Sequence, residues 1–229
     1  MASMGKTLGL LVAPVARTLT PRYVAEFIRN VLERAIDGAG PIPGAALSAD
    51  RLLVSSGGDR DAAIKHLIKN HVRAAGAQGF LTNLGGLVTA AAAIPANIAG
   101  LALVQCHLIA GIAHLRGYNL SDPRVRNAVL ACMVGQAGVT QLIKSGRINE
   151  SPRELATDPN PDPEMDQIIS RVVATELIAQ VGGKRVVTMV GKRIPLLGGA
   201  FGGGADGFRT WQVGRFATNS LTERHTIIG

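Results

Sequence analysis

The chain has few aromatic residues and no pattern typical of a β-sheet. Phe, Trp and Tyr make up only 3% of its 229 residues, so its apolar fraction of 47% consists mainly of Ala, Val, Leu and Ile, accompanied by 28 Gly. Small residues let helices approach one another closely, both in tight bundles and in membranes. No stretch alternates polar and apolar residues over several positions. We therefore predict an all-α protein: a helical bundle around a central Gly/Ala-rich apolar helical hairpin.

Cysteine is also scarce, which excludes several kinds of site. Cys106 and Cys132 are the only cysteines, and both lie in apolar sequence of helical character. Two thiols cannot supply the four ligands of a structural zinc site. We expect both to be reduced and buried, as in a cytoplasmic protein. The histidines show no spacing typical of a metal site, and we predict neither a metal nor a cofactor.

The first part of the chain contains one clear helix and then a looser stretch. Thr20-Pro21 is a capping signal, and Gly38, Gly40, Pro41 and Pro43 end the helix. Residues 1–58 are expected to form an N-terminal helical arm. The apolar run after Lys6 is broken by Pro14, so we interpret it as part of the mature chain and not as a signal peptide. The core stripe of this helix is predicted to consist of Val24, Phe27, Ile28, Val31, Leu32, Ala35 and Ile36.

A second helix begins near residue 60 and leads into the dominant feature of the sequence. Asp59 or Asp61 is the expected cap, and Ile64, Leu67, Ile68, Val72 and Ala75 form its apolar stripe. From Ala74 to Leu115 the chain contains no Asp, Glu, Lys or Arg. Pro95 divides this run, which predicts helices over 80–93 and 95–115, roughly 20 and 30 Å long, joined by a tight bend. The second is long enough to span a bilayer.

This hairpin has two interpretations. It could dip into lipid, with aromatic residues near its open ends beside Arg73 and Arg116. It could equally be a buried pair of core helices, because several polar side chains interrupt it, and each is costly in lipid unless paired. The predicted lipid-contact residues are Phe80, Leu84, Leu87, Leu101, Leu108 and Tyr118.

The last part of the chain alternates helices with loops. Asp122-Pro123 caps a helix that includes Val125 and Met133, residues 148–166 read as an exposed proline-rich loop, and another amphipathic helix follows. Residues 198–207 are predicted to form a glycine-rich turn, whose backbone N–H groups are a candidate anion site. A final helix runs through Phe208, Trp211, Val213 and Phe216.

Excess positive charge is the main indication of a partner. The net charge is +8, which favours anionic partners. Four residues near the C-terminus form a basic edge that is predicted to bind anionic lipid headgroups or, alternatively, to be merely solvated. Nucleic acid is not favoured, because aromatics for base stacking are few and no binding motif is present. The basic edge consists of Lys184, Arg185, Lys192 and Arg193.

Two motifs in the right order resemble the bacterial EcsC family. The first is the Gly-rich helix, proline and apolar helix of residues 79–118, followed by Asp122-Pro123. The second runs from Lys192 through Gly202-Gly203-Gly204 to Val213-Gly214. The resemblance defines an EcsC-like helical domain over residues 59–229. It implies a cytoplasmic, membrane-associated protein whose namesake is encoded beside a transporter, and it implies no catalytic residues.

These observations favour a non-enzymatic peripheral membrane or lipid-binding protein, accessory to a membrane transport system. It would lie in the cytoplasm or at the inner face of the cell membrane, and its partners would be anionic membrane lipid or an apolar ligand. A soluble homo-oligomeric scaffold, or one bound to a membrane-protein partner, is the alternative. A hydrolase is a third hypothesis, but the available Ser55, Ser56, His66, His71 and Asp206 fall in no nucleophile motif.

Overall fold

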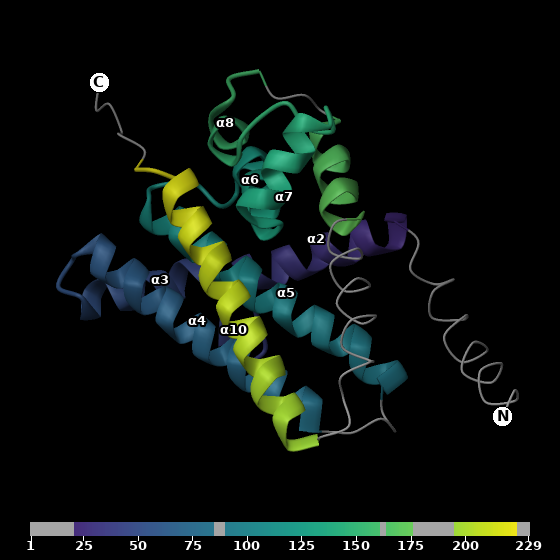
Figure 1. The fold of residues 1–229 in the computed structure, drawn as a ribbon. Coiled ribbons are helices and arrows are strands. Elements are labelled where there is room, and N and C mark those ends of the chain that lie inside the picture. Colours follow the sequence, from purple (N-terminus) through teal and green to yellow (C-terminus); the bar gives the residue numbers. More distant parts are fainter. Residues whose placement is uncertain (1–20, 85–89, 161–163, 176–194, 224–229) are drawn as a thin grey trace, which may run out of the picture.

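The computed structural model describes residues 21–84, 90–160, 164–175 and 195–223. This part of the chain is helical throughout except for connecting turns and one very small strand pair, which confirms the all-α prediction (Figure 1). Residues 165–175 are also helical. The remaining helices are α2 (Pro21–Asp37), α3 (Ala45–Ser55), α4 (Arg60–Leu84), α5 (Ala90–Leu115), α6 (Pro123–Met133), α7 (Gly135–Lys144), α8 (Pro152–Thr157) and α10 (Pro195–Ser220).

The first helix ends where the glycines and prolines predict. After α2, Gly38 and Gly40 adopt φ values of 101° and 60°, which only glycine adopts readily. Strands β1 (Gly38–Ala39) and β2 (Ile42–Pro43) pair antiparallel there. Two residues are too few to produce an alternating sequence pattern, so this strand pair was not predicted. The looser stretch expected before Gly58 is instead helix α3. Its N-cap is Gly44, which has no side chain to mark the helix start.

The N-terminal elements are part of the hydrophobic core. Helices α2 and α3 both pack against α5. Arg29 of α2 also pairs with Asp166 near the start of the helical segment 165–175. The arm predicted over residues 1–58 therefore contributes, in its described part, to the same core as the rest of the chain. Its contributions include Ile28, Leu32, Ala35, Ala45 and Ala49, all between 0% and 3% exposed.

The bend of the predicted hairpin does not lie at Pro95. Helix α4 starts as expected, with the Ala62 amide donating to Oδ1 of Asp59 at 3.0 Å, but it continues without a break to Leu84. Helix α5 begins at Ala90, so Pro95 lies in its second turn. Proline so near a helix start removes only one backbone hydrogen bond, and the four alanines before Ile94 are the best helix formers. The prediction of separate helices over 80–93 and 95–115 is therefore wrong.

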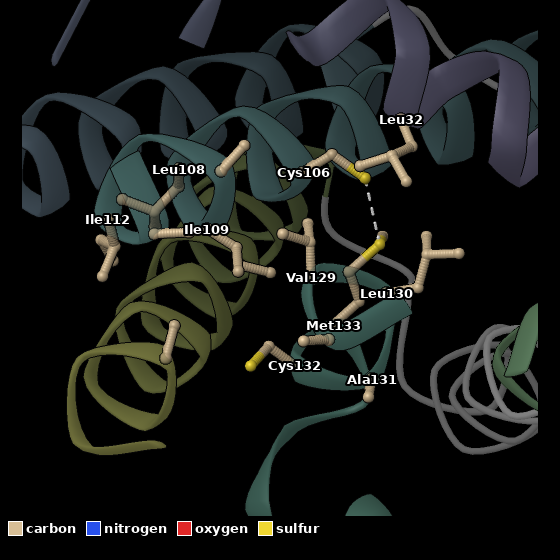
Figure 2. Close-up of a cluster of buried hydrophobic side chains, with 14 of the residues drawn as sticks. Leu32, Cys106, Leu108, Ile109, Ile112, Val129, Leu130, Ala131, Cys132 and Met133 are labelled. Atoms are coloured by element: carbon tan, nitrogen blue, oxygen red, sulfur yellow. Dashed lines mark hydrogen bonds between the residues drawn. The ribbon is translucent and has the colours of Figure 1, made fainter. Parts of the chain in front are cut away.

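The C-terminal half of α5 forms the centre of the core. Leu108, Ile109 and Ile112 are fully buried, and they lie between α10 and the apolar side chains of α6 (Figure 2). Cys106 points toward Met133, and its Sγ donates to the Met133 Sδ at 3.1 Å. Across the described residues, no helix has the length and hydropathy needed to cross a bilayer. The prediction that 95–115 could span a membrane is thus corrected.

Helix α10 replaces the predicted glycine-rich turn. It runs unbroken from Pro195 to Ser220 and lies along α4 (Figure 1). A Cβ at Gly207 would come within 3.3 Å of the Val72 carbonyl oxygen, and one at Gly214 within 3.1 Å of Ile68 and Leu108 side chains. The glycines therefore serve close helix packing. The backbone N–H groups of residues 202–207 lie inside a helix, which removes the proposed anion site.

The segment between α5 and residue 175 also contains more helix than expected. Asp122 caps α6, as predicted, by accepting from the Arg124 amide at 2.9 Å. The helix breaks at Gly135, whose φ of 76° separates α6 from α7. Within the predicted exposed loop 148–166, Ser151 and Glu154 form a capping box that starts α8, and Leu155 of α8 is buried.

Candidate functional site

Two of the predicted lipid-contact residues lie in the core and not on the surface. Leu108 is fully buried and Tyr118 is 3% exposed, so in this fold both contact protein. The Tyr118 hydroxyl donates to the Thr222 carbonyl at 3.0 Å. Leu101 is half-buried. Two groups lie outside the residues whose side chains are described: Phe80, Leu84 and Leu87 of the hairpin, and Lys184, Arg185, Lys192 and Arg193 of the basic edge.

A groove between α7 and α10 offers a different candidate surface. Its volume is about 1000 Å³. Helix α10 has one side against α4 and α5, where Gly207, Thr210 and Gly214 are buried. The residues that follow each of these positions turn outward by helical periodicity. The groove is lined by Gln136, Thr140 and Lys144 of α7 and by Phe208, Trp211 and Arg215 of α10, among others.

Two large aromatic side chains are exposed on this face. Phe208 is 59% and Trp211 44% exposed. Their rings are stacked, with centroids 5.8 Å apart and planes 20° from parallel. The Arg215 guanidinium carbon lies 5.8 Å from the centroid of the Trp211 ring, a cation–π distance. Trp211 is the only tryptophan of the chain. An apolar ring beside a cation is the combination found at membrane–water interfaces.

The groove is also one-sided in charge. Lys144, Arg209 and Arg215 are among its lining residues, and none of the described residues that line it is Asp or Glu. Arg209 already interacts with another group. Lys144 and Arg215 are therefore the cations that the groove offers to a ligand. A surface of this kind attracts anions and repels cations.

A row of basic side chains on α4 runs beside the α10 contact. Lys65, Lys69 and Arg73 are spaced four residues apart, so they share one face of α4, and all three are exposed. Within the described residues they make no ion pair. The neighbouring Ile68 meets Gly214 of α10. The row therefore places three exposed positive charges on α4, next to its contact with α10.

The described residues contain two serine–histidine contacts, and neither forms a catalytic constellation. Ser56 Oγ lies 3.5 Å from His66 Nδ1 at an exposed position, and Ser48 Oγ lies 3.4 Å from His107 Nε2. The same His107 nitrogen lies 3.0 Å from the Pro43 carbonyl oxygen, which accepts a hydrogen bond from it. In the described part of the chain, neither serine reaches a His–carboxylate pair, and no three His, Cys, Asp or Glu residues could hold a metal ion. Asp206 lies on α10, half-buried.

Sequence reasoning missed the groove residues as a site. It placed Phe208 and Trp211 in a final helix and gave them no role. Their spacing of three residues, followed by Arg215, is equally consistent with an exposed aromatic–basic face. Only the position of the neighbouring helices distinguishes the two, because Gly207 and Gly214 decide which side of α10 is buried.

Comparison with known proteins identifies a family but no characterised relative. The model of the EcsC protein family matches residues 58–225, which include every helix from α4 to α10. No curated protein and no solved structure matches the chain. The family match covers well over half of the sequence and contains both motifs on which the resemblance rested. The chain therefore belongs to the EcsC protein family.

Proposed function

We propose that this protein is a non-enzymatic peripheral membrane protein that binds anionic lipid surfaces reversibly through the outer face of α10. The observation that supports the proposal best is the exposed Phe208–Trp211 stack with Arg215 beside it, on a groove without acidic lining residues. Exposed aromatic rings at the headgroup level and nearby cations are the two elements of interfacial binding.

The energies indicate that this contact is weak and reversible. Complete burial of a Phe-sized side chain contributes about 1.5–3 kcal/mol, and burial at an interface is incomplete. Each Lys or Arg close to an anionic surface adds about 1 kcal/mol. The total is comparable to that of a single myristoyl chain, which binds marginally with a constant of about 10⁴ M⁻¹. Stable attachment would therefore need a second contact, for which the basic edge of residues 184–193 and the hairpin remain predictions.

Vesicle co-sedimentation tests the proposal. We expect the protein to pellet with vesicles that contain an anionic phospholipid but not with neutral vesicles, and to be released as salt is raised, because surface charges are screened within about 10 Å at 0.1 M salt. Phe208→Ala combined with Trp211→Ala should reduce binding roughly tenfold or more, for a loss of at least about 1.4 kcal/mol. Arg215→Gln should weaken binding about fivefold.

Two substitutions on α3 provide matched controls. Val54→Ala removes an apolar side chain that is 81% exposed, and Arg51→Gln removes an exposed positive charge. Both lie outside the groove, so vesicle binding should be unchanged in each. Equal loss of binding in groove and control variants would contradict the proposal, as would an absence of binding at low salt.

A soluble homo-oligomeric scaffold remains the alternative, since the same aromatic pair could pack against a second copy. Native mass spectrometry distinguishes the two. A defined, detergent-independent oligomer that dissociates in the Phe208→Ala, Trp211→Ala variant would favour the scaffold. The accessory role in a membrane transport system stays a prediction from the family resemblance.

A further inference from the structure

A half-buried histidine of α4, His71, faces a buried histidine of α5, His107. His71 Nε2 lies 2.9 Å from His107 Nδ1, and the ring centroids are 5.0 Å apart. The outer nitrogens are engaged as well. His71 Nδ1 lies 2.8 Å from the Leu67 carbonyl oxygen, and His107 Nε2 lies 3.0 Å from that of Pro43 in β2. The pair thus connects α4, α5 and the strand pair that precedes α3.

The number of protons this arrangement can hold follows from its acceptors. A carbonyl oxygen only accepts, so His71 Nδ1 and His107 Nε2 must each carry a proton to bond with it. A neutral imidazole has one N–H, which leaves the two facing nitrogens without protons. One further proton between them completes three hydrogen bonds. A fourth would place two N–H groups against each other across 2.9 Å, with two positive charges in one site.

The surroundings offer no compensation for a second charge. Burial lowers the pKa of His71 to about 4, partly offset by its bond to Leu67, and the charge of His107 lowers it further. Burial also lowers the pKa of His107, partly offset by Pro43. Within the described residues, no carboxylate is among the groups that shift either pKa.

The charged groups on the neighbouring elements are directed elsewhere. On α3, Asp50 pairs with His114 of α5, whose Nε2 is 2.7 Å from its carboxylate. On α4, Lys69 and Arg73 are exposed. On α10, Asp206 and Arg209 have partners of their own. On α2, Arg29 pairs with Asp166.

We infer that the His71–His107 pair is a proton-operated switch in the seam between α4 and α5. The seam is closed while the two facing nitrogens carry no proton or share one. A second proton between these two nitrogens forces the helices apart. This inference does not depend on lipid binding. It assigns a function to two histidines whose sequence context predicts neither a metal site nor a nucleophile motif.

The direction of the pH dependence follows from the lowered pKa values. A histidine whose pKa is lower in the folded state binds protons more readily when the chain is unfolded. Its contribution to stability is therefore complete above the ordinary histidine pKa of 6.5. It is lost as the pH falls from 6.5 to about 4, where His71 titrates in the folded protein.

Nitrogen NMR of the full chain, labelled at histidine, tests the inference directly. Between pH 7.5 and 4, we expect the rings of His71 and His107 to titrate below the ordinary histidine pKa of 6.5 and in two separate steps. Amide exchange in α4 and α5 should accelerate at the second step. Titration of both rings together near the ordinary histidine pKa of 6.5 would overturn the inference, as would a second step that leaves exchange unchanged.

A variant series adds an independent test. His71→Asn combined with His107→Gln removes both titrating rings but retains side-chain N–H groups for the two carbonyls. Between pH 6.5 and 4, the folding equilibrium constant of the wild type should fall roughly a hundredfold more than that of this variant. The control His66→Gln, an exposed position on the same helix, should follow the wild type. If the paired variant retains the wild-type pH dependence, the inference is wrong. If it does not fold at neutral pH, the wild-type NMR titration decides.

Discussion

A Cβ atom at position 111 of α5 would lie 2.8 Å from the Cδ2 atom of Leu67 on α4. Both residues are buried, and Leu67 is only 1% exposed, so the leucine has little room to move. This contact and the His71–His107 pair lie in the same seam between the two helices. The absence of a side chain at Gly111 therefore sets how closely α4 approaches α5.

Gly111→Ala should destabilise the protein by about 1–3 kcal/mol, because an added methyl group overpacks the seam. Urea denaturation measures the change. Gly204→Ala is the matched control, since a Cβ at that position of α10 meets nothing within 4 Å. It should stabilise by about 0.5–1 kcal/mol through higher helix propensity. In a Leu67→Ala background the cost of Gly111→Ala should shrink, and an unchanged cost would show that Leu67 is not the obstacle.

Tyr118→Phe should lower stability by about 1 kcal/mol, because it removes the buried hydroxyl that donates to the Thr222 carbonyl. Since Tyr118 is buried, vesicle binding by the folded variant should not change. The measurements are urea denaturation and co-sedimentation on the same preparation. A loss of vesicle binding with unchanged stability would instead support the interfacial anchor expected from the sequence.

Both cysteines should be unreactive toward thiol reagents in the native state. Cys106 and Cys132 are fully buried, and burial raises the pKa of each thiol above its ordinary value, so little thiolate exists at neutral pH. Modification should proceed at the rate of unfolding and become fast in denaturant. Rapid labelling of either thiol in the native protein would show that the core between α5 and α6 opens readily.

Much of the fold could be predicted from apolar periodicity and capping residues. The stripe from Ile64 to Ala75, the Asp59 and Asp122 caps and the end of α2 near Gly38 are all found in the structure. Such signals are local, because a helix buries one face and its ends need partners for their N–H and C=O groups.

The wrong predictions concern proline and glycine, because each of these residues is compatible with two different local structures. Pro95 breaks a helix in its interior but is tolerated near its start. The glycines of α10 allow a turn but also close packing, and the choice depends on Val72 and Ile68, which lie more than a hundred residues earlier in the chain. Propensity alone cannot include such tertiary contacts.

The bend position also explains why the histidine pair was missed. Two contacting pairs lie at equal sequence distances on either side of position 89, between the end of α4 and the start of α5. These pairs are His71 with His107 and Leu67 with Gly111. A hairpin centred near Pro95 would place neither pair together. The groove at Phe208 and Trp211 could not be identified from the sequence either, because the exposed side of α10 depends on which side packs against α4.

The fluorescence of Trp211 tests the central proposal most directly. It is the only tryptophan, it is 44% exposed, and it lies in the proposed membrane contact, so no labelling is needed. Addition of vesicles with anionic lipid should shift its emission to shorter wavelength and make it quenchable by bromine atoms placed just below the headgroups. Salt should reverse both effects. An emission that stays unchanged and unquenched while the protein sediments with the vesicles would contradict the account, because binding would then use another surface.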